Sequence, residues 1–519
     1  MTRHPTMGRK GKLRRGFIIA GFAVLGLVTL LVILLATVSP LNRRWVLKAL
    51  KEHYHSNVAL KSFRVTLFPR ITARGEGLVL SYPDRPGAPP LASIRRFSMN
   101  VSWLGLLRDP KRVRDVQLEG LTINVLPRHQ KQEQPKKEHH LPPFYLENVQ
   151  ADGTVLNIFS SDPQKPPRVF AISKLRLRSV GVGKAMSFQT ILTNPKPIGE
   201  IRSAGEFGPW NPGDPSETPV SGTYAFRDAD LSTIHGIAGI LASDGKYHGV
   251  LERINVDGET DTPDFALDIS GHPEHLKTEF HAIVDGRTGQ TLLQPVKAQL
   301  GRSSIIARGG ALRTKGKKGT TIVLTVTTDH AHLADLLGLA VKSSRPPMTG
   351  LFNLTMRLDL PPGDERVTQR LKLNGKFGIR SVRFSDPNIQ RKITHLSRRG
   401  EGEPGEASGT TVVSNLNGSF ALSNGAIAFS RLSFDVPGAS VNLHGAYGLT
   451  SEHMDFRGTL RLKAELSETT TGVKSVLLKA VDPLFKGKHA GTVIPIKITG
   501  DRQHPSFGIQ IGKALLRKR

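Results

Sequence analysis

The sequence contains no cysteine, which excludes disulfide bonds and thiolate metal sites. Acidic residues are also few, with 43 Asp and Glu against 72 Lys and Arg, and the net charge is +29. An excess of this size favours anionic partners such as phospholipid head groups, unless the whole proteome of the source is basic. Nucleic acid is a poor candidate, because aromatic residues make up only 6% of the chain and no recognition module is present.

Motifs that mark enzymes are missing as well. The chain has no HExxH, no P-loop, no GxGxxG at a strand–helix junction and no GxSxG elbow. Two histidine groups resemble metal ligands, namely Asp329, His330 and His332, and His272, His275 and His281. Asp329 is better explained as the N-cap of a helix over 329–341, and Pro273 prevents helical ligand spacing in the second group. The sequence therefore predicts a protein without enzymatic activity, cofactor or metal site.

Long hydrophobic runs are rare, and only one is long enough to span a bilayer. Residues 17–38 form 22 positions without a charge. About 20 apolar residues cross a bilayer as a helix, whereas a cleaved secretory signal has an apolar core of only about 7–15. Six Lys and Arg residues precede the run without an acidic residue among them. We expect a retained transmembrane helix, a cytoplasmic N-terminus and a large body on the far side of the membrane.

Short alternating runs dominate the rest of the chain, and its 52 glycines and 34 prolines suit a β-rich protein with many turns. The expected regions are a basic tail (1–16), the membrane helix (17–38), a first β-rich region (41–126), a polar linker (127–143), a middle β-rich region (144–385), a loop (386–410) and a C-terminal β-rich region (411–519). A helix over 471–485 interrupts the last region, because its apolar residues form one stripe.

A local repeat adds to this pattern. The segments VQLEGLTINV (116–125) and VQADGTVLNI (149–158) align without a gap, at an offset of 33 residues, and share Val, Gln, Gly and Asn. We interpret them as one strand–turn–strand unit used twice, although a chance match is an alternative and two copies do not establish a solenoid.

The strands have one apolar and one polar face, which permits two arrangements. They could close into a sandwich or barrel core, or form one long curved sheet whose apolar face lines a groove. The regular pattern without a strong domain break favours the elongated sheet. Pro495 lies inside the strand pattern of 494–499, and proline in a strand indicates an edge, a strand start or a bulge.

Two regions resemble the AsmA-like proteins of diderm bacteria, which are more distantly related to the YhdP and TamB group. The first is 64–125, with the order strand, Phe-Pro, strand, loop, strand, Leu-Leu, strand, and with Pro69, Leu106, Leu107 and a turn at Gly120 in place. The second is 416–509, which includes DPLF and IPIKITG. The middle of the chain, which could select a ligand or partner, matches less specifically.

The resemblance implies a single-pass protein of the cell inner membrane with a periplasmic body and a role in outer-membrane biogenesis. It also implies movement of phospholipid along a groove in a strongly curved antiparallel sheet with a few short helices. The expected groove residues are Leu432, Phe434, Val436, Leu443, Leu460, Leu462, Ile494, Ile496, Ile498, Phe507 and Ile509. Ordinary core packing is the alternative for each of them. Arg398 and Arg399 are candidate contacts for a phosphate head group, or else part of a solvated loop.

The expected partners are therefore the membrane, a phospholipid or other acylated lipid, and an envelope protein. A second hypothesis is an assembly factor that handles outer-membrane β-proteins by strand addition at an exposed sheet edge. A third is an exported enzyme with an unrecognised site.

Overall fold

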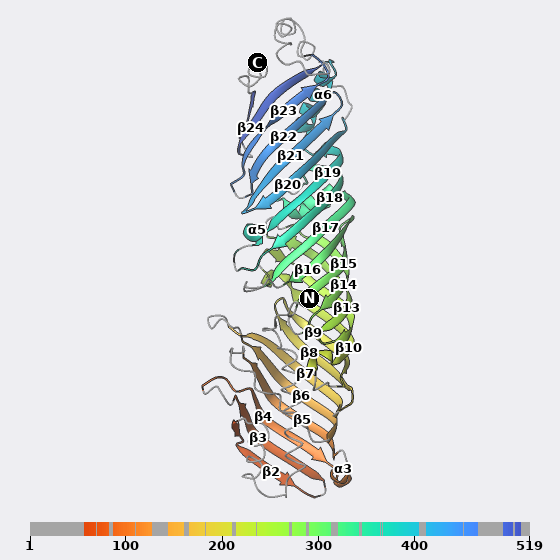
Figure 1. The fold of residues 1–519 in the computed structure, drawn as a ribbon, viewed down its shortest axis with the longest axis vertical. Helices are drawn as coiled ribbons and strands as arrows, with labels where there is room; N and C mark the ends of the chain where they lie inside the picture. The colour runs from red at the N-terminus through yellow and green to blue at the C-terminus, as the bar shows by residue number, and fades with distance from the viewer. Residues whose placement is uncertain are drawn as a thin grey trace, which may run out of the picture. The chain divides into compact units, whose positions relative to one another are not determined.

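The structure, a computed structural model, describes residues 57–509 except 69, 83–86, 109–110, 127–143, 160–165, 182, 210–213, 235, 269–271, 287–289, 313–319, 342–344, 364, 366, 404–411, 450, 466–490 and 502–503. Strands dominate this part of the chain and belong to one large, mainly antiparallel sheet that is not closed (Figure 1). This confirms the predicted fold class at the level of a β-rich protein with an open sheet.

The chain divides into two compact units. Of the described residues, unit 1 comprises those up to 233, 241–260 and 281–291, and unit 2 comprises 234–240, 261–280 and those from 292 onwards. Four strands lie where the chain alternates between the units, namely β11 (Ile237–Ala238), β12 (Ile240–Val250), β13 (Arg253–Leu267) and β14 (Glu274–Val284).

Unit 1 is built on strands that follow one another along the chain. Its strands are β1 (Asn57–Ala59), β2 (Ser62–Thr66), β3 (Ile71–Ser81), β4 (Ala92–Val101), β5 (Lys111–Val125), β6 (Phe144–Ile158), β7 (Arg168–Gly181), β8 (Met186–Pro195), β9 (Ile198–Phe207) and β10 (Pro219–Asp230), with helix α3 (Trp103–Leu107) and the 3-10 turns Pro215–Glu217 and Leu231–Thr233. Its core is fully buried: Leu78, Met99, Leu121 and Leu146 all have less than 2% of their surface exposed.

The predicted repeat becomes two neighbouring strands. β5 and β6 pair in parallel, with Val116 opposite Val149 and Asn124 opposite Asn157, so each repeat residue lies beside its counterpart. The Nδ2 of Asn157 donates a hydrogen bond of 2.9 Å to the Oδ1 of Asn124. This parallel pair is an exception to the antiparallel sheet that we expected. The two copies thus form equivalent neighbouring strands, and neither is the strand–turn–strand unit that we predicted.

The glycine of the repeat does not form a turn, so the predicted turn at Gly120 is wrong. β5 continues through it, and β6 continues through Gly153, each with φ of +63°. The buried positions step from Leu118 to Leu121, three residues instead of two. The pairing of β5 with β4 and with β6 keeps the same register on both sides of the glycine, so no residue is inserted. The positive-φ residue itself reverses the alternation, and the apolar residues before and after it point to the same face.

We expect Gly153→Ala to lower the free energy of unfolding by about 1–2 kcal/mol, because alanine is strained at positive φ. A Cβ at this position would meet no atom within 4 Å, so crowding does not contribute. Gly153→Asn is the matched control and loses less, since asparagine tolerates the left-handed region. Equilibrium urea unfolding measures both. Equal losses for the two variants would contradict the backbone explanation.

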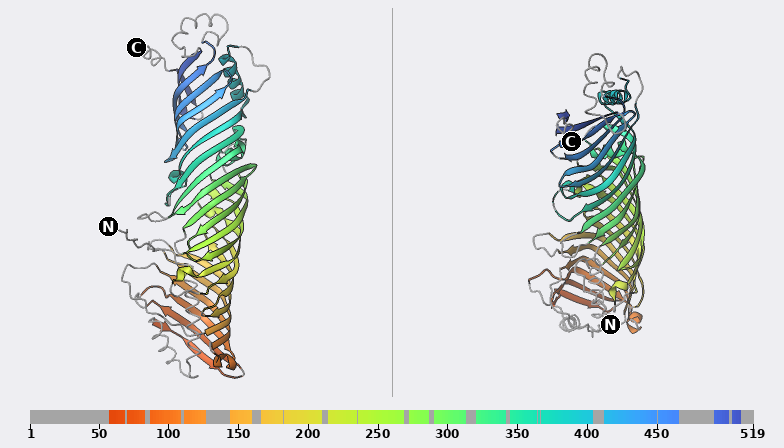
Figure 2. Two further views of the ribbon diagram at one scale, coloured as in Figure 1. Left: turned by 45° about the vertical axis from the view of Figure 1, so that its right-hand side comes forward. Right: turned by 45° about the horizontal axis from the view of Figure 1, so that its top comes forward.

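Unit 2 is an antiparallel meander from β16 to β25, in which each strand pairs with the next (Figure 2). Its strands are β15 (Thr291–Leu300), β16 (Ser303–Leu312), β17 (Thr321–His332), β18 (Met348–Leu360), β19 (Lys372–Phe384), β20 (Ser414–Ser423), β21 (Ala426–Val436), β22 (Ala439–Gly448), β23 (His453–Leu462), β24 (Thr492–Asp501) and β25 (Pro505–Ile509), with helices α4 (Leu333–Ala340), α5 (Val367–Arg370) and α6 (Pro387–Gly400).

The predicted loop over 386–410 is wrong for its first part, because 387–400 form helix α6. Asp386 caps the helix by accepting a hydrogen bond of 2.7 Å from the Asn388 backbone N–H, and proline occupies the first helical position. The helix contacts β19, β21, β22 and β23, and its Ile393 is buried with Val436, Ala439 and Leu462. α6 therefore covers one end of the C-terminal strands.

Several predictions fall outside the described residues: the basic tail 1–16, the membrane helix 17–38, the linker 127–143 and the helix 471–485. Within the described residues, no helix is both long and apolar enough to cross a membrane.

Candidate functional site

The C-terminal strands of unit 2 carry their apolar side chains in three rows that run across the sheet. Because antiparallel partners opposite each other share a face, the strand register defines these rows. We call them together the apolar face: Phe352, Ile379, Leu416, Phe434, Val441, Leu460 and Ile494; Leu354, Phe377, Gly418, Leu432, Leu443, Gly458 and Ile496; Met356, Gly375, Phe420, Phe429, Gly445, Phe456 and Ile498. Each row crosses all seven strands from β18 to β24.

Side chains on the apolar face are mostly half-buried, which distinguishes them from the core of unit 1. Among the non-glycine residues of the three rows only Ile379 is fully buried, and none is exposed. A face packed against a second layer along its whole length would have buried side chains, as Leu78 and Leu121 do in unit 1. The described chain supplies such cover at α6 and also at α4, whose Leu333 is buried with Ile379 and Val382.

Aromatic rings bridge the rows near the middle of the face. The ring centroid of Phe377 lies 6.3 Å from that of Phe352, 6.1 Å from Phe420 and 6.4 Å from Phe429, and Phe429 lies 5.9 Å from Phe456. Glycines beside the rings make room for them. A Cβ on Gly418 would lie 2.5 Å from the Phe377 ring, so this ring lies over the Gly418 backbone.

The predicted groove residues divide into three groups. Leu432, Leu443, Ile496 and Ile498 are half-buried members of the apolar face. Val436 and Leu462 are buried beneath α6, at 9% and 8% exposure, so they form packed core and are not open to a ligand.

Of the remaining predicted groove residues, three are partly covered by neighbouring side chains, and for the other two only the strand pairing is described. Phe434, Leu460 and Ile494 are half-buried and pack partly against the cluster under α6. Phe507 and Ile509 lie on β25 opposite Ile498 and Ile496. These five residues extend the rows towards α6 and towards the last strand.

The predicted head-group contacts are at the end of α6. Arg398 and Arg399 are in its last turn, where positive side chains interact favourably with the helix dipole, and their carbonyl groups accept hydrogen bonds from the Glu401 N–H. They belong to a helix end and not to the loop that we predicted. Arg399 is exposed and Arg398 is half-buried.

The sequence prediction missed the half of the apolar face that lies on β18–β20, including Phe352, Phe377 and Phe420. The alternation of Leu354, Met356, Leu358 and Leu360 was visible and indicated a strand. Alternation alone does not show which strands share a face, because that depends on register.

Pro495 lies in β24, which has β23 on one side along its whole length. On the other side β25 pairs only with Ile496–Gly500, so Pro495 is the first residue beyond that ladder. Proline has no backbone N–H to donate to a neighbouring strand. The predicted relation between Pro495 and a sheet edge is thus consistent with its place in the strand.

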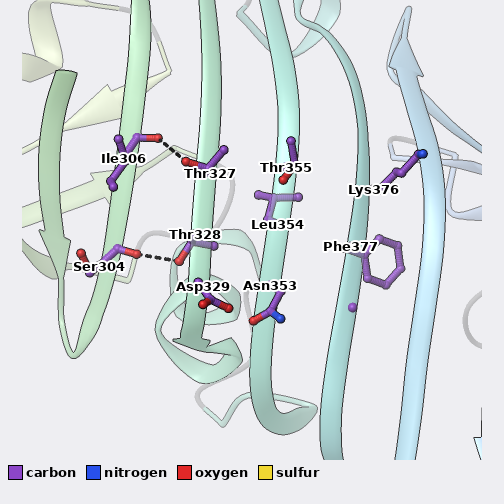
Figure 3. Close-up of a pocket in the computed structure, with 11 residues that line it drawn as sticks. Ser304, Ile306, Thr327, Thr328, Asp329, Asn353, Leu354, Thr355, Lys376 and Phe377 are labelled. Carbon is purple, nitrogen blue, oxygen red and sulfur yellow. Dashed lines mark hydrogen bonds between the residues drawn. The ribbon is translucent and has the colours of Figure 1, made fainter. Parts of the chain in front are cut away.

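A hollow of about 560 Å³ lies over β16–β19 and provides a place to test the enzyme hypothesis (Figure 3). Asp329 and Lys376 are the charged members of its lining. Beside it, Arg380 donates a hydrogen bond of 3.1 Å to His330 Nε2, and His330 Nδ1 lies 3.0 Å from Asp329 Oδ2. Both ring nitrogens of His330 are therefore engaged, which leaves neither free to act as a general base.

The histidine groups are not brought together as metal ligands. His275 donates to Asp261 and His281 lies beside Asp257, each at 2.7 Å. The hydrogen bond from His275 lowers the pKa of Asp261, with a smaller contribution from Lys277. Asp329 lies in β17 and is not a helix cap, since His332 precedes α4, so that prediction is wrong. No cluster of three or more His, Cys, Asp or Glu with metal-binding geometry occurs in the part of the chain that the structure describes.

Compared with protein-family models, with curated proteins and with solved structures, the chain matches none. The likeness to AsmA-like proteins therefore remains a prediction from the sequence.

Proposed function

We propose that the protein is a non-enzymatic lipid carrier whose apolar face holds the acyl chains of a phospholipid or another acylated lipid. The observation that carries this proposal is the half-buried state of the apolar face over seven strands. An exposed or half-exposed apolar surface of this extent is typical of a binding surface. The opposite side of the same strands is polar, with Lys376, Arg457 and Lys497 among its residues.

The energetics of the face suit a ligand that moves along it. Burial of an acyl chain contributes about 0.8 kcal/mol for each CH₂ group. Strands are about 4.8 Å apart, so three rows across seven strands offer similar apolar contacts over roughly 29 Å. A lipid displaced by one strand exchanges one set of contacts for a similar set, so no position along the face holds it much more strongly than the neighbouring positions.

In the proposed setting, residues 17–38 anchor the chain in the inner membrane with the N-terminus in the cytoplasm. The body is periplasmic and acts in outer-membrane biogenesis. The groove would be the concave side of an elongated, strongly curved sheet. Support comes from the charge pattern around 17–38, from the resemblance to AsmA-like proteins and from the open β-sheet.

Strand addition at a sheet edge has weaker support as an alternative. β25 is only five residues long and begins with Pro505, and short strands and proline are features that protect an edge against further pairing. A function through this edge would require an incoming strand to pair with a poor template.

Site-specific photo-crosslinking in intact cells tests the proposal. A photoreactive residue at Phe456 or Ile496 faces the apolar side, and the same residue at Arg457 or Lys497, one position along, faces the polar side. We expect lipid adducts at the first pair and few at the second. Leu462, which is buried, serves as a second control. Protein adducts alone at Phe456 and Ile496, or equal lipid adducts on both sides, would contradict a carrier.

A further inference from the structure

Unit 1 has four large apolar side chains exposed where strands β2 and β4 end. Phe68 is 85% exposed, Leu104 69%, Trp103 54% and Leu67 41%. We call these four residues the apolar tip. Exposed aromatic and leucine side chains gathered in one place usually mark a surface that meets a partner.

The two segments of the apolar tip are neighbours in space. Leu67 and Phe68 follow β2, whose last residue, Thr66, pairs with Thr72 near the start of β3. Trp103 and Leu104 follow β4, whose last residue, Val101, pairs with Ile71. Both segments thus leave the sheet at the same end of β3.

The exposure of Trp103 and Leu104 is enforced by packing on the other side of α3. Gly105 is buried, and a Cβ there would lie 2.5 Å from the Arg112 carbonyl oxygen on β5. The Ser102 hydroxyl accepts a hydrogen bond of 3.0 Å from the Gly105 N–H and fixes the first turn. With the glycine side of this turn held against β5, the tryptophan and leucine point away from the sheet.

Positive charges predominate in the sequence around the apolar tip, although Asp109 follows Arg108 directly. Segments 64–70 and 102–108 contain Arg64, Arg70 and Arg108, all exposed, and no acidic residue. Tryptophan favours the interface between head groups and acyl chains, and arginine favours anionic head groups. A protein partner would match the apolar residues equally well, but the arginines together with Trp103 fit an anionic bilayer surface better.

We propose that the apolar tip inserts into the interface of a bilayer that contains anionic phospholipid. Phe68, Trp103 and Leu104 would lie among the head groups and upper acyl chains, and Arg70 and Arg108 would contact phosphate groups. This contact is additional to the anchor expected at 17–38 and does not depend on lipid carriage by the apolar face. It holds one edge of unit 1 at a membrane.

The absence of cysteine makes the test direct, because single thiols can be labelled in the full chain. Phe68→Cys and Trp103→Cys place an environment-sensitive fluorophore at the apolar tip. Ile198→Cys is the matched control, since Ile198 is apolar, 52% exposed and lies in β9 of the same unit. Each labelled protein is reconstituted into vesicles of phosphatidylcholine with or without phosphatidylglycerol, and nitroxide-bearing lipids act as quenchers.

In vesicles with phosphatidylglycerol we expect the nitroxide lipids to quench both tip labels about threefold more strongly than the Ile198 label, with a blue shift of emission. Without phosphatidylglycerol the difference becomes smaller. Equal lipid quenching at all three positions would overturn the proposal. Tip labels that are protected from a water-soluble quencher but not quenched by lipid would also overturn it and would indicate a protein contact instead.

Discussion

Replacement of Phe456 by aspartate is expected to reduce the lipid that remains bound to the purified protein by about tenfold. Phe456 lies on β23, the sixth of the seven strands of the apolar face, between Gly445 and Ile498 in its row, and is half-buried. A carboxylate there would either stay charged beside an acyl chain or become protonated, and both states cost free energy. A loss of about 1.4 kcal/mol in binding already corresponds to a factor of ten.

The measurement is the molar ratio of extracted lipid to protein, determined by mass spectrometry after mild detergent purification. Lys497→Asp is the control, because it introduces the same group one strand away on the polar face. Lys497 is opposite Arg457, so the new aspartate gains an oppositely charged neighbour. Thermal unfolding of both variants verifies that they remain folded. If both variants lose lipid equally, or neither does, the apolar face is not where lipid binds.

Local sequence patterns predicted much of the β-structure, because side-chain alternation is itself the physical requirement of a half-buried strand. The runs that contain Leu432, Leu460 and Ile496 are strands in the structure. The repeat at 116–125 and 149–158 was also visible. Its parallel pairing was not, since pairing partners depend on the chain between the repeats and on the rest of the sheet.

The secondary-structure prediction was wrong at the glycines of the repeat and at the start of the segment 386–410. Gly120 and Gly153 were interpreted as turn residues because glycine at positive φ is common in turns, but both strands continue through these residues without a change of register. Residues 387–400 were assigned to a loop because of the charged, glycine-rich stretch at their end. The Asp386 cap followed by Pro387 was a helix-start signal that the prediction overlooked.

The candidate site was only partly accessible to sequence reasoning. Leu118 and Leu443 lie in similar alternating runs, yet Leu118 is 1% exposed and Leu443 is half-buried. The difference arises from what lies over each face, and alternation contains no information about that. For the same reason the sequence could not show that α6 covers Val436 and Leu462.

Because the core of unit 1 is buried and the apolar face of unit 2 is only half-buried, the same substitution should change the free energy of unfolding by different amounts in the two units. Leu121→Ala is expected to lower the free energy of unfolding of unit 1 by about 3–4 kcal/mol, because Leu121 is 0% exposed and its removal leaves a cavity. Leu443→Ala should cost unit 2 only about 1 kcal/mol, since a half-buried leucine gives up less contact and water can fill the space. The two substitutions remove the same atoms from strands of the same sheet.

Hydrogen exchange with mass spectrometry measures both effects in the full chain, through peptides from β4–β6 for Leu121→Ala and from β21–β23 for Leu443→Ala. For Leu121→Ala, urea unfolding followed by tryptophan fluorescence gives an independent value, because all three tryptophans precede residue 234. A loss of about 3 kcal/mol or more for Leu443→Ala would mean that the apolar face is a packed core, which would remove the basis for a lipid groove. A small loss would show that this face has room for a ligand.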